Sequence, residues 1–282
     1  MSEAPFGRRL ATVTGVDELG VYRVLRVADQ VMPQSGWQAG ELQPGQFAML
    51  AAAERWGGGE GERPYLPRAF SVARRTDHEA HFLLEDVGPG TQRLCELRAG
   101  DQLWLLAPLG RGFIPPSDGR RALLVGGGVG IAPLAIFQDT LAAGLGEGHG
   151  SAEATVLLGF RDSSRAPGAA LLEAAQVATD DGSVGHHGLV TELLAAEIDR
   201  DPHAVVYACG PAGMLEGVRA LCERTSTPAQ LALEAGMACG YGACFGCVVP
   251  KRGGGYLRVC VDGPVIDAAE LEHVDSHAGA PA

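Results

Sequence analysis

Four cysteines close to the C-terminal end have the spacing of an iron–sulfur site. They follow the pattern C-x4-C-x2-C-x12-C, and they are Cys239, Cys244, Cys247 and Cys260. Two tetrahedral irons bridged by sulfide need four soft ligands, and C-x4-C-x2-C with a distant fourth cysteine is a known 2Fe–2S spacing. Glycines surround the first three cysteines, where they permit a tight loop and let backbone N–H groups approach the cluster. The pattern therefore favours a 2Fe–2S cluster.

Two other interpretations of these cysteines remain open at this point, a structural zinc site and a set of buried free thiols. Zinc sites usually contain close C-x2-C pairs, and only Cys244 and Cys247 form one.

A lone iron–sulfur cluster moves single electrons. The remaining residues must therefore explain what it exchanges electrons with.

A glycine-rich turn follows the apolar run RALLV and has features of a dinucleotide-binding turn. It contains Gly126, Gly127, Gly128 and Gly130, and Pro133 can start the next helix. Backbone N–H groups at such a helix start, on the carboxyl edge of a parallel sheet, bind dinucleotide phosphates. The spacing is G-x-G-x-G, so the usual G-x-G-x-x-G fingerprint is not met. Close helix–strand packing is the alternative explanation of these glycines.

Cys209 and Gly210 end the apolar run AVVYA, so they should lie at the same sheet edge. A nicotinamide ring could rest there, and the alternative is a buried strand end followed by a turn. Arg161, Asp180 and Asp181 are candidates for ribose and adenine contacts, with a solvated loop as the alternative. Arginines 161 and 165 could receive a 2′-phosphate, whereas the aspartates would repel one, so the choice between NAD and NADP stays open.

Two earlier stretches contain residues that could hold a second nucleotide cofactor. In RAFS at 68–71 a guanidinium can pair with a pyrophosphate, an aromatic ring can stack on a planar ring, and a hydroxyl can reach a ring nitrogen. In GPGT at 88–91 a turn enters a helix and offers N–H groups and the Thr91 hydroxyl to a phosphate. The alternatives are a solvated arginine and an ordinary N-cap. No pattern of nucleophile and base stands out, so we predict no catalytic side chain. His186 and His187 have no partner motif, and we expect them in a solvated loop.

The hydrophobic patterns predict a multi-domain fold. Six short alternating runs between Arg9 and Pro108 indicate an antiparallel six-stranded β-barrel. Alternating strands and helices then indicate an α/β domain with a parallel sheet, with helices at about 131–145, 167–176, 190–197 and 212–224. A hairpin at about 247–260 belongs to a small C-terminal iron–sulfur domain, which is short enough that its cluster should lean on the preceding domain or on a partner.

We place the domain boundaries at 6–116 for the barrel, 117–227 for the α/β domain, 228–270 for the cluster domain and 271–282 for a tail. Pro115 and Pro116, with Asp118 and Gly119, make a plausible hinge. The loop at 53–67 is unusually long.

Charge and composition limit the class of partner and the compartment. The 282 residues carry a net charge of −12 at pH 7. This balance argues against nucleic acid or an anionic membrane surface, which both select clustered Lys and Arg. We see neither a signal peptide nor a membrane span. Seven cysteines in such a chain indicate a reducing compartment, so we expect a cytoplasmic protein.

Taken together, these residues resemble the electron-transfer subunits of type B dihydroorotate dehydrogenase, a family in the ferredoxin-reductase superfamily. The resemblance covers nearly the whole chain in the same order. The stretches that carry it are PGQF at 44–47, RAFS at 68–71, GPGT at 88–91, LGRGF at 109–113, LVGGGVGIAPL at 124–134, LLGFR at 157–161, TDDGS at 179–183, YACGPAGML at 207–215, MACGYGACFGCVVP at 237–250 and RVCVDGPV at 258–265.

The resemblance implies three cofactors, FAD, NAD and a 2Fe–2S cluster, in three domains. The glycine turn and Cys209-Gly210 would contact the NAD, and the four cysteines would ligate the cluster. The FAD would be lined by Arg68, Ala69, Phe70, Ser71, Leu83, Leu84, Glu85, Gly90 and Thr91. Two departures from the family pattern are Phe70, where the superfamily usually has tyrosine, and the longer loop at 53–67.

The resemblance also implies a function and a partner. A separate FMN-containing catalytic subunit would oxidise dihydroorotate in pyrimidine biosynthesis, and electrons would pass through the cluster and FAD to NAD+, in a heterotetramer with two copies of each chain. One alternative is a similar NAD(P)H oxidoreductase module that serves a sulfide-linked or ferredoxin-linked partner. Another is a redox sensor that binds the cofactors without turnover.

Overall fold

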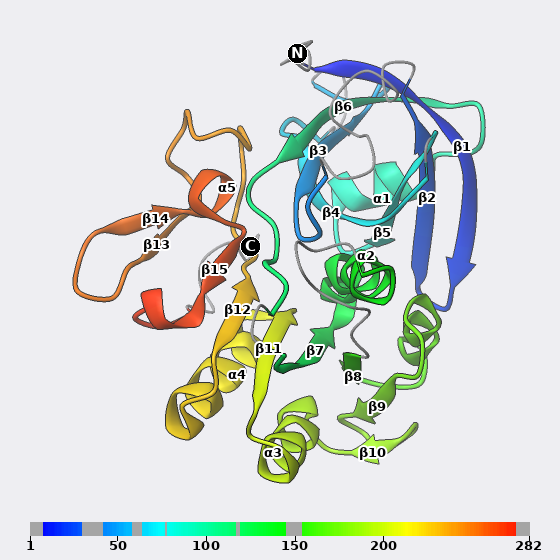
Figure 1. Ribbon diagram of the computed structural model, residues 1–282. Helices are drawn as coiled ribbons and strands as arrows, with labels where there is room; N and C mark the ends of the chain where they lie inside the picture. Colours follow the sequence, from blue (N-terminus) through cyan, green and yellow to red (C-terminus); the bar gives the residue numbers. More distant parts are fainter. Residues whose placement is uncertain are drawn as a thin grey trace.

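The computed structural model describes residues 8–29, 42–57, 64–76, 78–116, 119–144 and 154–274. Its three parts are a barrel, a sheet with helices, and a C-terminal cluster segment (Figure 1). The expected tail from 275 onward, residues 117 and 118 of the expected hinge, and residues 58–63 of the long loop lie outside the described residues.

The N-terminal part is a closed antiparallel barrel with strand order β1-β2-β5-β4-β3-β6, which confirms the predicted six strands. Alternate residues of β6 are buried, as a strand with one face on a core requires. Helix α1 (Pro89–Cys95) follows β5. The strands are β1 (Arg9–Leu19), β2 (Tyr22–Ala28), β3 (Phe47–Ala52), β4 (Arg68–Arg75), β5 (Ala80–Glu85) and β6 (Gln102–Leu109).

The second part is a seven-stranded sheet of order β10-β9-β8-β7-β11-β12-β15, parallel except at β15. Helix α2 (Ile131–Ala142) is almost wholly apolar because it packs against both the sheet and barrel strand β4, and Figure 1 shows it between the two. Helices α3 (Val190–Arg200) and α4 (Ala212–Thr225) pack against each other. The strands are β7 (Arg121–Gly127), β8 (Ala154–Phe160), β9 (Gln176–Thr179), β10 (His186–His187), β11 (Ala204–Cys209), β12 (Ala229–Ala232) and β15 (Val265–Asp267).

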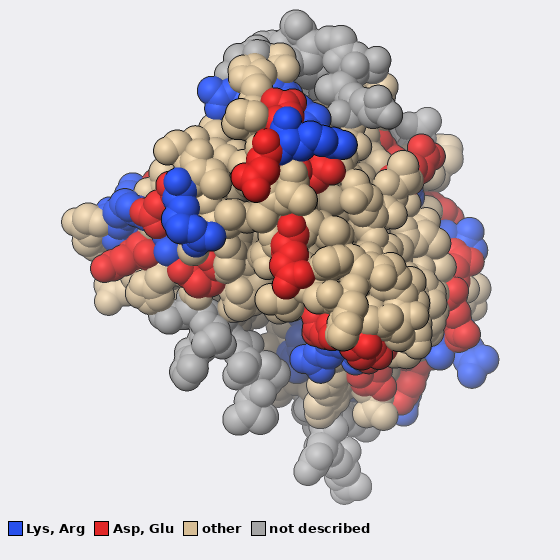
Figure 2. Space-filling view, turned by 90° about the horizontal axis from the view of Figure 1, so that it is seen from below, with Lys and Arg blue, Asp and Glu red and all other residues tan. Residues whose placement is uncertain are grey.

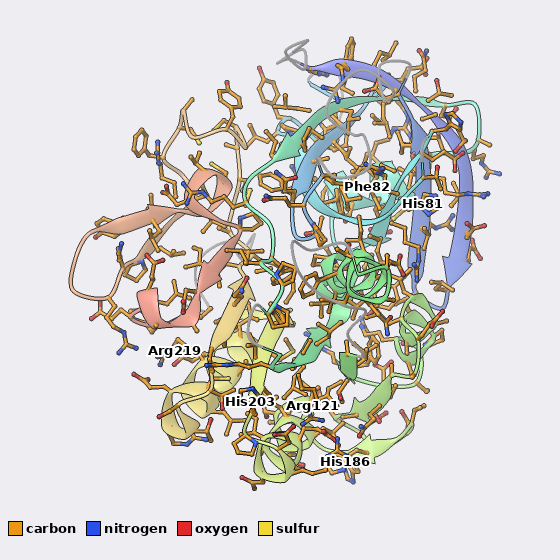
Figure 3. All side chains as sticks on the ribbon, in the orientation of Figure 1. His81, Phe82, Arg121, His186, His203 and Arg219 are labelled. Atoms are coloured by element: carbon orange, nitrogen blue, oxygen red, sulfur yellow. The ribbon has the colours of Figure 1, made fainter. Side chains whose placement is uncertain are left out.

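Two local expectations for this part were wrong. The helix expected at 167–176 is a short 3-10 turn, η3 (Ala166–Leu171), followed by strand β9. Gly168 lies against the barrel, where an added Cβ would come 2.8 Å from the ring of Tyr22, so packing between the parts fixes this turn. His186 and His187, expected in a loop, form the edge strand β10 instead, and His186 lies at the end of the sheet remote from the barrel (Figure 3).

The C-terminal segment is tied to both other parts. Its hairpin of β13 (Val248–Pro250) and β14 (Tyr256–Arg258) leads into the short helix α5 (Val259–Asp262), after which β15 returns to the sheet beside β12. The Arg111 N–H, just after the barrel, donates to the Gly263 carbonyl. The cluster segment therefore leans on the preceding parts, as expected from its length. We retain the predicted domain boundaries as a proposal, with β12 and β15 attached to the sheet.

The surface mixes both signs of charge. On the face seen in Figure 2, acidic and basic side chains alternate around a broad uncharged area. No helix among the described residues combines the length and the apolar character that a membrane crossing requires.

Candidate cofactor and redox sites

The four cysteines predicted to hold a cluster lie together, and they associate in two pairs. The Cys239 thiol is hydrogen-bonded to that of Cys244, and the Cys260 thiol to that of Cys247. The hairpin explains the second pair, because Val248, next to Cys247, is the register partner of Arg258, two residues before Cys260. The Cys260 N–H also donates to Cys247 Sγ at 3.4 Å.

The surroundings of Cys239 favour a thiolate. Burial raises its pKa, but hydrogen bonds from the backbone of Cys244, Tyr241 and Ala243 lower it further, to a net value of about 6. Burial and the neighbouring Cys247 instead raise the pKa of Cys260 to about 12. Backbone N–H groups directed at a sulfur are the contacts that stabilise a ligating thiolate.

The paired arrangement fits a cluster of two irons. Among the described residues, no three His, Cys, Asp or Glu side chains converge on a position for a single metal ion. A cluster of two bridged irons needs four thiolate ligands, and the four cysteines provide that number.

The cluster loop packs directly on the barrel. Gly240 has a φ of +81°, and an added Cβ would come 2.5 Å from Met49 Cγ on strand β3. Met49 is in turn the register partner of Ala69 in the RAFS stretch on β4. Only one strand therefore separates the cluster loop from the residues predicted to line the flavin.

The structure brings RAFS and the GPGT turn together. An added Cβ at Gly90 would lie 2.5 Å from Arg68 Nε, so the guanidinium lies directly against this turn. Residues 68–71 are all partly exposed. The Thr91 hydroxyl accepts hydrogen bonds from the N–H groups of Val87 and Gly88 and donates to the Gly88 carbonyl. It therefore closes the turn, and the backbone of the turn is what faces Arg68.

The predicted contacts on β5 differ in their surroundings. Leu83 and Leu84 are buried in the core. The Glu85 carboxylate accepts from Arg165 at 2.8 Å, and Arg165 also pairs with Asp162. Arg165 thus joins the sheet to the barrel. Its guanidinium is already paired with two carboxylates, which argues against a role in binding a 2′-phosphate.

The glycine turn and Cys209-Gly210 also come together. Gly126 is the register partner of Cys209 on the adjacent strand, and a Cβ at Gly130 would come 2.5 Å from the Cys209 backbone. A Cβ at Gly127 would come 2.7 Å from Met214 Sδ on α4, and Gly128 has a φ of +56°. Close packing therefore accounts for Gly126, Gly127 and Gly130, and a left-handed turn accounts for Gly128. The same packing places the start of α2 at the sheet edge where dinucleotides bind.

Cys209 is buried, and burial followed by the charge of Glu234 raises its pKa well above the usual value. Its thiol is therefore protonated and neutral at physiological pH. The remaining candidates, Arg161, Asp180 and Asp181, lie on adjacent loops, because the Asp181 N–H donates to the Arg161 carbonyl. Arg161 and both aspartates are exposed.

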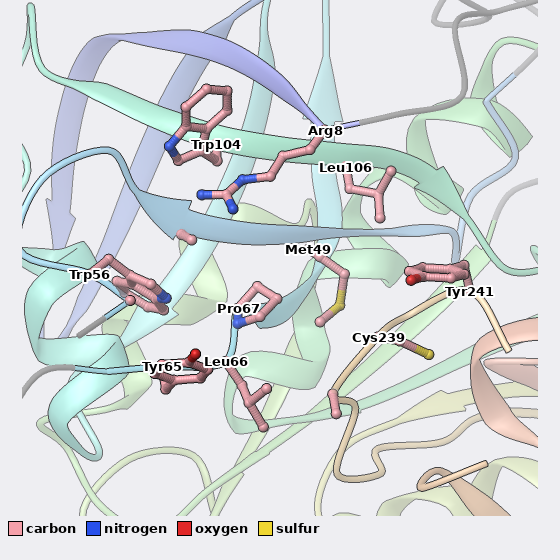
Figure 4. Close-up of a pocket in the computed structure, with 13 residues that line it drawn as sticks. Arg8, Met49, Trp56, Tyr65, Leu66, Pro67, Trp104, Leu106, Cys239 and Tyr241 are labelled. Atoms are coloured by element: carbon pink, nitrogen blue, oxygen red, sulfur yellow. The ribbon is translucent and has the colours of Figure 1, made fainter. Parts of the chain in front are cut away.

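A pocket that sequence reasoning missed lies between the barrel and the cluster loop (Figure 4). Its volume is about 790 Å³, and Cys239 is the one lining residue predicted from the sequence. The aromatic residues come from separate segments with no shared spacing, so no sequence signal marks them. The side chains that define the pocket include Arg8, Trp56, Tyr65, Trp104 and Tyr241.

Comparison with known proteins identifies relatives that match most of the chain. Residues 234–272 match the model of a family described as the iron-sulfur cluster binding domain of dihydroorotate dehydrogenase B. The "Dihydroorotate dehydrogenase B (NAD(+)), electron transfer subunit" of Caldanaerobacter subterraneus subsp. tengcongensis is 35% identical, over 87% of this chain and 94% of the relative. The subunit of the same name from Geobacillus thermodenitrificans is 38% identical, over 81% and 86%.

Solved structures agree on the fold. The structure of an NADH-dependent reduced ferredoxin-NADP oxidoreductase is 24% identical, with a TM-score of 0.74 over 95% of this chain and 91% of that one. Phthalate dioxygenase reductase is 16% identical, with a TM-score of 0.58 over 93% and 77%. These likenesses support the fold alone, whereas the identity and coverage of the relatives show the family. The chain belongs to the family of electron transfer subunits of dihydroorotate dehydrogenase B.

Proposed function

We propose that this chain carries electrons from a separate FMN-containing dihydroorotate dehydrogenase subunit to NAD+ in pyrimidine biosynthesis. Its cofactors are FAD, a 2Fe–2S cluster and NAD. The observation that carries this function is the convergence of the three sites. The cluster loop packs on Met49 of β3, β3 pairs with RAFS of β4, and α2 joins β4 to the nucleotide edge of the sheet.

The chain holds and orients the cofactors and supplies no acid or base. Cys239, Cys244, Cys247 and Cys260 would hold the cluster, as the neighbouring pairs Cys239–Cys244 and Cys247–Cys260. The Arg68 guanidinium lies against the Gly90 turn, so together they bind the flavin pyrophosphate. Phe70 and Ser71 contact the flavin ring system, with the backbone of residues 83–85 beside it. When bound, FAD converts one-electron transfer from the cluster into two-electron transfer to NAD+.

The glycine turn at 126–130 binds the NAD pyrophosphate at the start of α2. The nicotinamide ring rests against Cys209 and Gly210, where the protonated thiol presents a small uncharged surface. Buried Cys209 therefore positions the ring and does not act as a nucleophile.

The catalytic subunit docks over the cluster loop. Cys244 is exposed, as are the neighbouring apolar side chains of Tyr241 and Phe245. An exposed apolar group around a redox centre is a surface suited to a protein partner. We place the complex in the cytoplasm as a heterotetramer with two copies of each subunit.

The proposal is tested with the chain purified anaerobically and alone. It should contain FAD and a 2Fe–2S cluster and should oxidise NADH with ferricyanide as acceptor. It should not oxidise dihydroorotate until the FMN-containing subunit is added. Dihydroorotate oxidation by the chain alone would remove the proposed division of labour. A chain that copurifies with a ferredoxin-linked partner and never responds to dihydroorotate would move the function to another substrate.

A further inference from the structure

Glu234 is a carboxylate at the nucleotide edge that none of the predicted sites uses. It lies two residues after the end of β12, whose last residue, Ala232, is the register partner of Cys209. The Leu233 N–H donates to the Pro264 carbonyl, which fixes the chain at this point. Glu234 therefore extends past the carboxyl end of the sheet beside Cys209 and Gly210. Its charge contributes to the raised pKa of Cys209, so its field reaches this residue.

Among the residues that the structure describes, no cation neutralises the carboxylate of Glu234. It has no hydrogen bond or ion pair with any residue that the structure describes. Other glutamates of this part, such as Glu197 and Glu216, are each paired with arginine. Glu234 is open to solvent, yet protein surrounds it closely enough that burial raises the pKa of its carboxyl group. A ligand can therefore reach this carboxylate, and a positive charge beside it would be stabilised.

We propose that Glu234 discriminates between the oxidised and reduced forms of the dinucleotide by favouring the positively charged ring of NAD+ over the neutral ring of NADH. This inference rests on the proposed function, which places the nicotinamide at Cys209. The two forms share the same adenosine, riboses and pyrophosphate and differ in the charge of the ring. A carboxylate beside the ring therefore acts on the redox state of the ligand. Cys209 carries no charge with which to do so.

The consequence concerns the direction of turnover. Such a site binds NAD+ more tightly than NADH, whose ring is neutral. It therefore favours binding of the oxidant and release of the reduced product. Exposed ion pairs contribute up to about 1 kcal/mol, which corresponds to about a fivefold change in affinity. Neutralising Glu234 should therefore remove about a fivefold preference for NAD+ over NADH.

The test measures binding to the oxidised holoprotein by calorimetry with three ligands. These are NAD+, a tetrahydronicotinamide analogue whose ring is neutral and cannot donate hydride, and ADP-ribose, which lacks the ring. Glu234→Gln should weaken the binding of NAD+ about fivefold and leave the affinities for the other two ligands unchanged. Glu173→Gln, which removes an exposed carboxylate elsewhere on the same part, should change none of them. Glu234→Asp keeps the charge and should retain most of the preference.

Three results would overturn the inference. Unchanged NAD+ affinity in Glu234→Gln would show that the carboxylate does not act on the ring. Equal weakening of all three ligands would indicate a structural role instead. If the wild-type protein binds none of the three, the proposed NAD site falls together with the role of Glu234. Flavin and cluster absorbance, recorded for each variant, confirms that the protein compared is the intact holoprotein.

Discussion

The substitution of Gly130 by alanine tests how closely the nucleotide turn approaches Cys209. The added Cβ would meet backbone atoms at 2.5 Å, and backbone cannot move aside as a flexible side chain can. We expect a loss of about 1–3 kcal/mol in stability, together with weaker NAD binding. Chemical denaturation and NAD titration measure the two effects.

Gly213→Ala is the matched control, because a Cβ at Gly213 in α4 meets no atom within 4 Å. This change should be neutral or slightly stabilising, since alanine favours helix more than glycine does. Equal behaviour of the two variants would mean that the turn does not lie against Cys209.

His81 on β5 makes barrel stability depend on pH. Burial, and then the charges of Arg26 and Arg74, lower its pKa below the usual 6.5, although Glu79 opposes the shift. The unfolded chain therefore takes up a proton near pH 6.5 that the folded chain does not. Stability is retained above that pH and is lost as the pH falls through it.

Between about pH 8 and about pH 6, the melting temperature of the wild type should therefore fall more than that of His81→Gln. His78→Gln, at an exposed site nearby, should follow the wild type. Parallel curves for wild type and His81→Gln would contradict the buried neutral histidine. Figure 3 shows where His81 lies on β5 of the barrel.

Some site residues could be predicted at this scale and others could not. The cysteines, glycines and RAFS stand in contiguous patterns whose spacing reflects local chemistry. In contrast, the hydrogen bond between Arg165 and Glu85 joins residues that lie 80 positions apart in the sequence. The Thr91 hydroxyl was expected near a phosphate, yet it closes its own turn. Glu234 and the pocket aromatics carry no spacing signal, because tertiary contacts alone bring them to the site.

At the scale of elements, the Glu85–Arg165 pair joins β5 of the barrel to the segment beside η3. Both side chains are largely buried, so the charged hydrogen bond is only partly screened. Arg165→Ala should lower stability by about 1–3 kcal/mol. It should leave the preference between NADH and NADPH unchanged, since Arg165 is already occupied.

Arg161→Ala, at an exposed site on the same loop, should have little effect on stability and is the control for the melting temperature alone. Melting temperatures and steady-state rates with both nucleotides measure these effects. A switch in nucleotide preference in Arg165→Ala would show that this arginine faces the ligand instead.

The elements themselves were predicted where periodicity is strong. The six alternating runs of the barrel and helices α2, α3 and α4 follow from their apolar spacing. The helix expected at 167–176 failed because Gly168 must pack on Tyr22, a contact made by a different part of the chain. Strand β15 has only three residues, too few for a pattern, and β12 supplies its partner. Local sequence patterns therefore do not predict short elements whose form depends on distant neighbours.

At the scale of the whole molecule, the exposed apolar residues of the cluster loop predict where the partner binds. Phe245 is 62% exposed and lies between Cys244 and Cys247. Phe245→Ser should weaken binding of the catalytic subunit about tenfold, as loss of a central aromatic contact does. Oxidation of NADH with ferricyanide should be unchanged in the isolated chain.

Leu189→Ser is the control, since Leu189 is similarly exposed but lies at the start of α3 in the sheet part. It should bind the partner normally. If both variants bind the partner equally well in a pull-down with the FMN-containing subunit, the cluster face is not the interface.

The relay through the cluster is tested most directly in the complex. The chain is coexpressed with the proposed FMN-containing subunit and purified anaerobically as wild type, Cys244→Ser and Cys95→Ser. Cys95 is a partly buried cysteine outside the cluster loop. Dihydroorotate and then NAD+ are added, and FMN reduction, FAD reduction and NADH formation are followed separately.

We predict NADH formation in the wild type and in Cys95→Ser. In Cys244→Ser the FMN should still be reduced, while FAD stays oxidised and no NADH appears. NADH formation at the wild-type rate in Cys244→Ser would contradict electron transfer through the cluster.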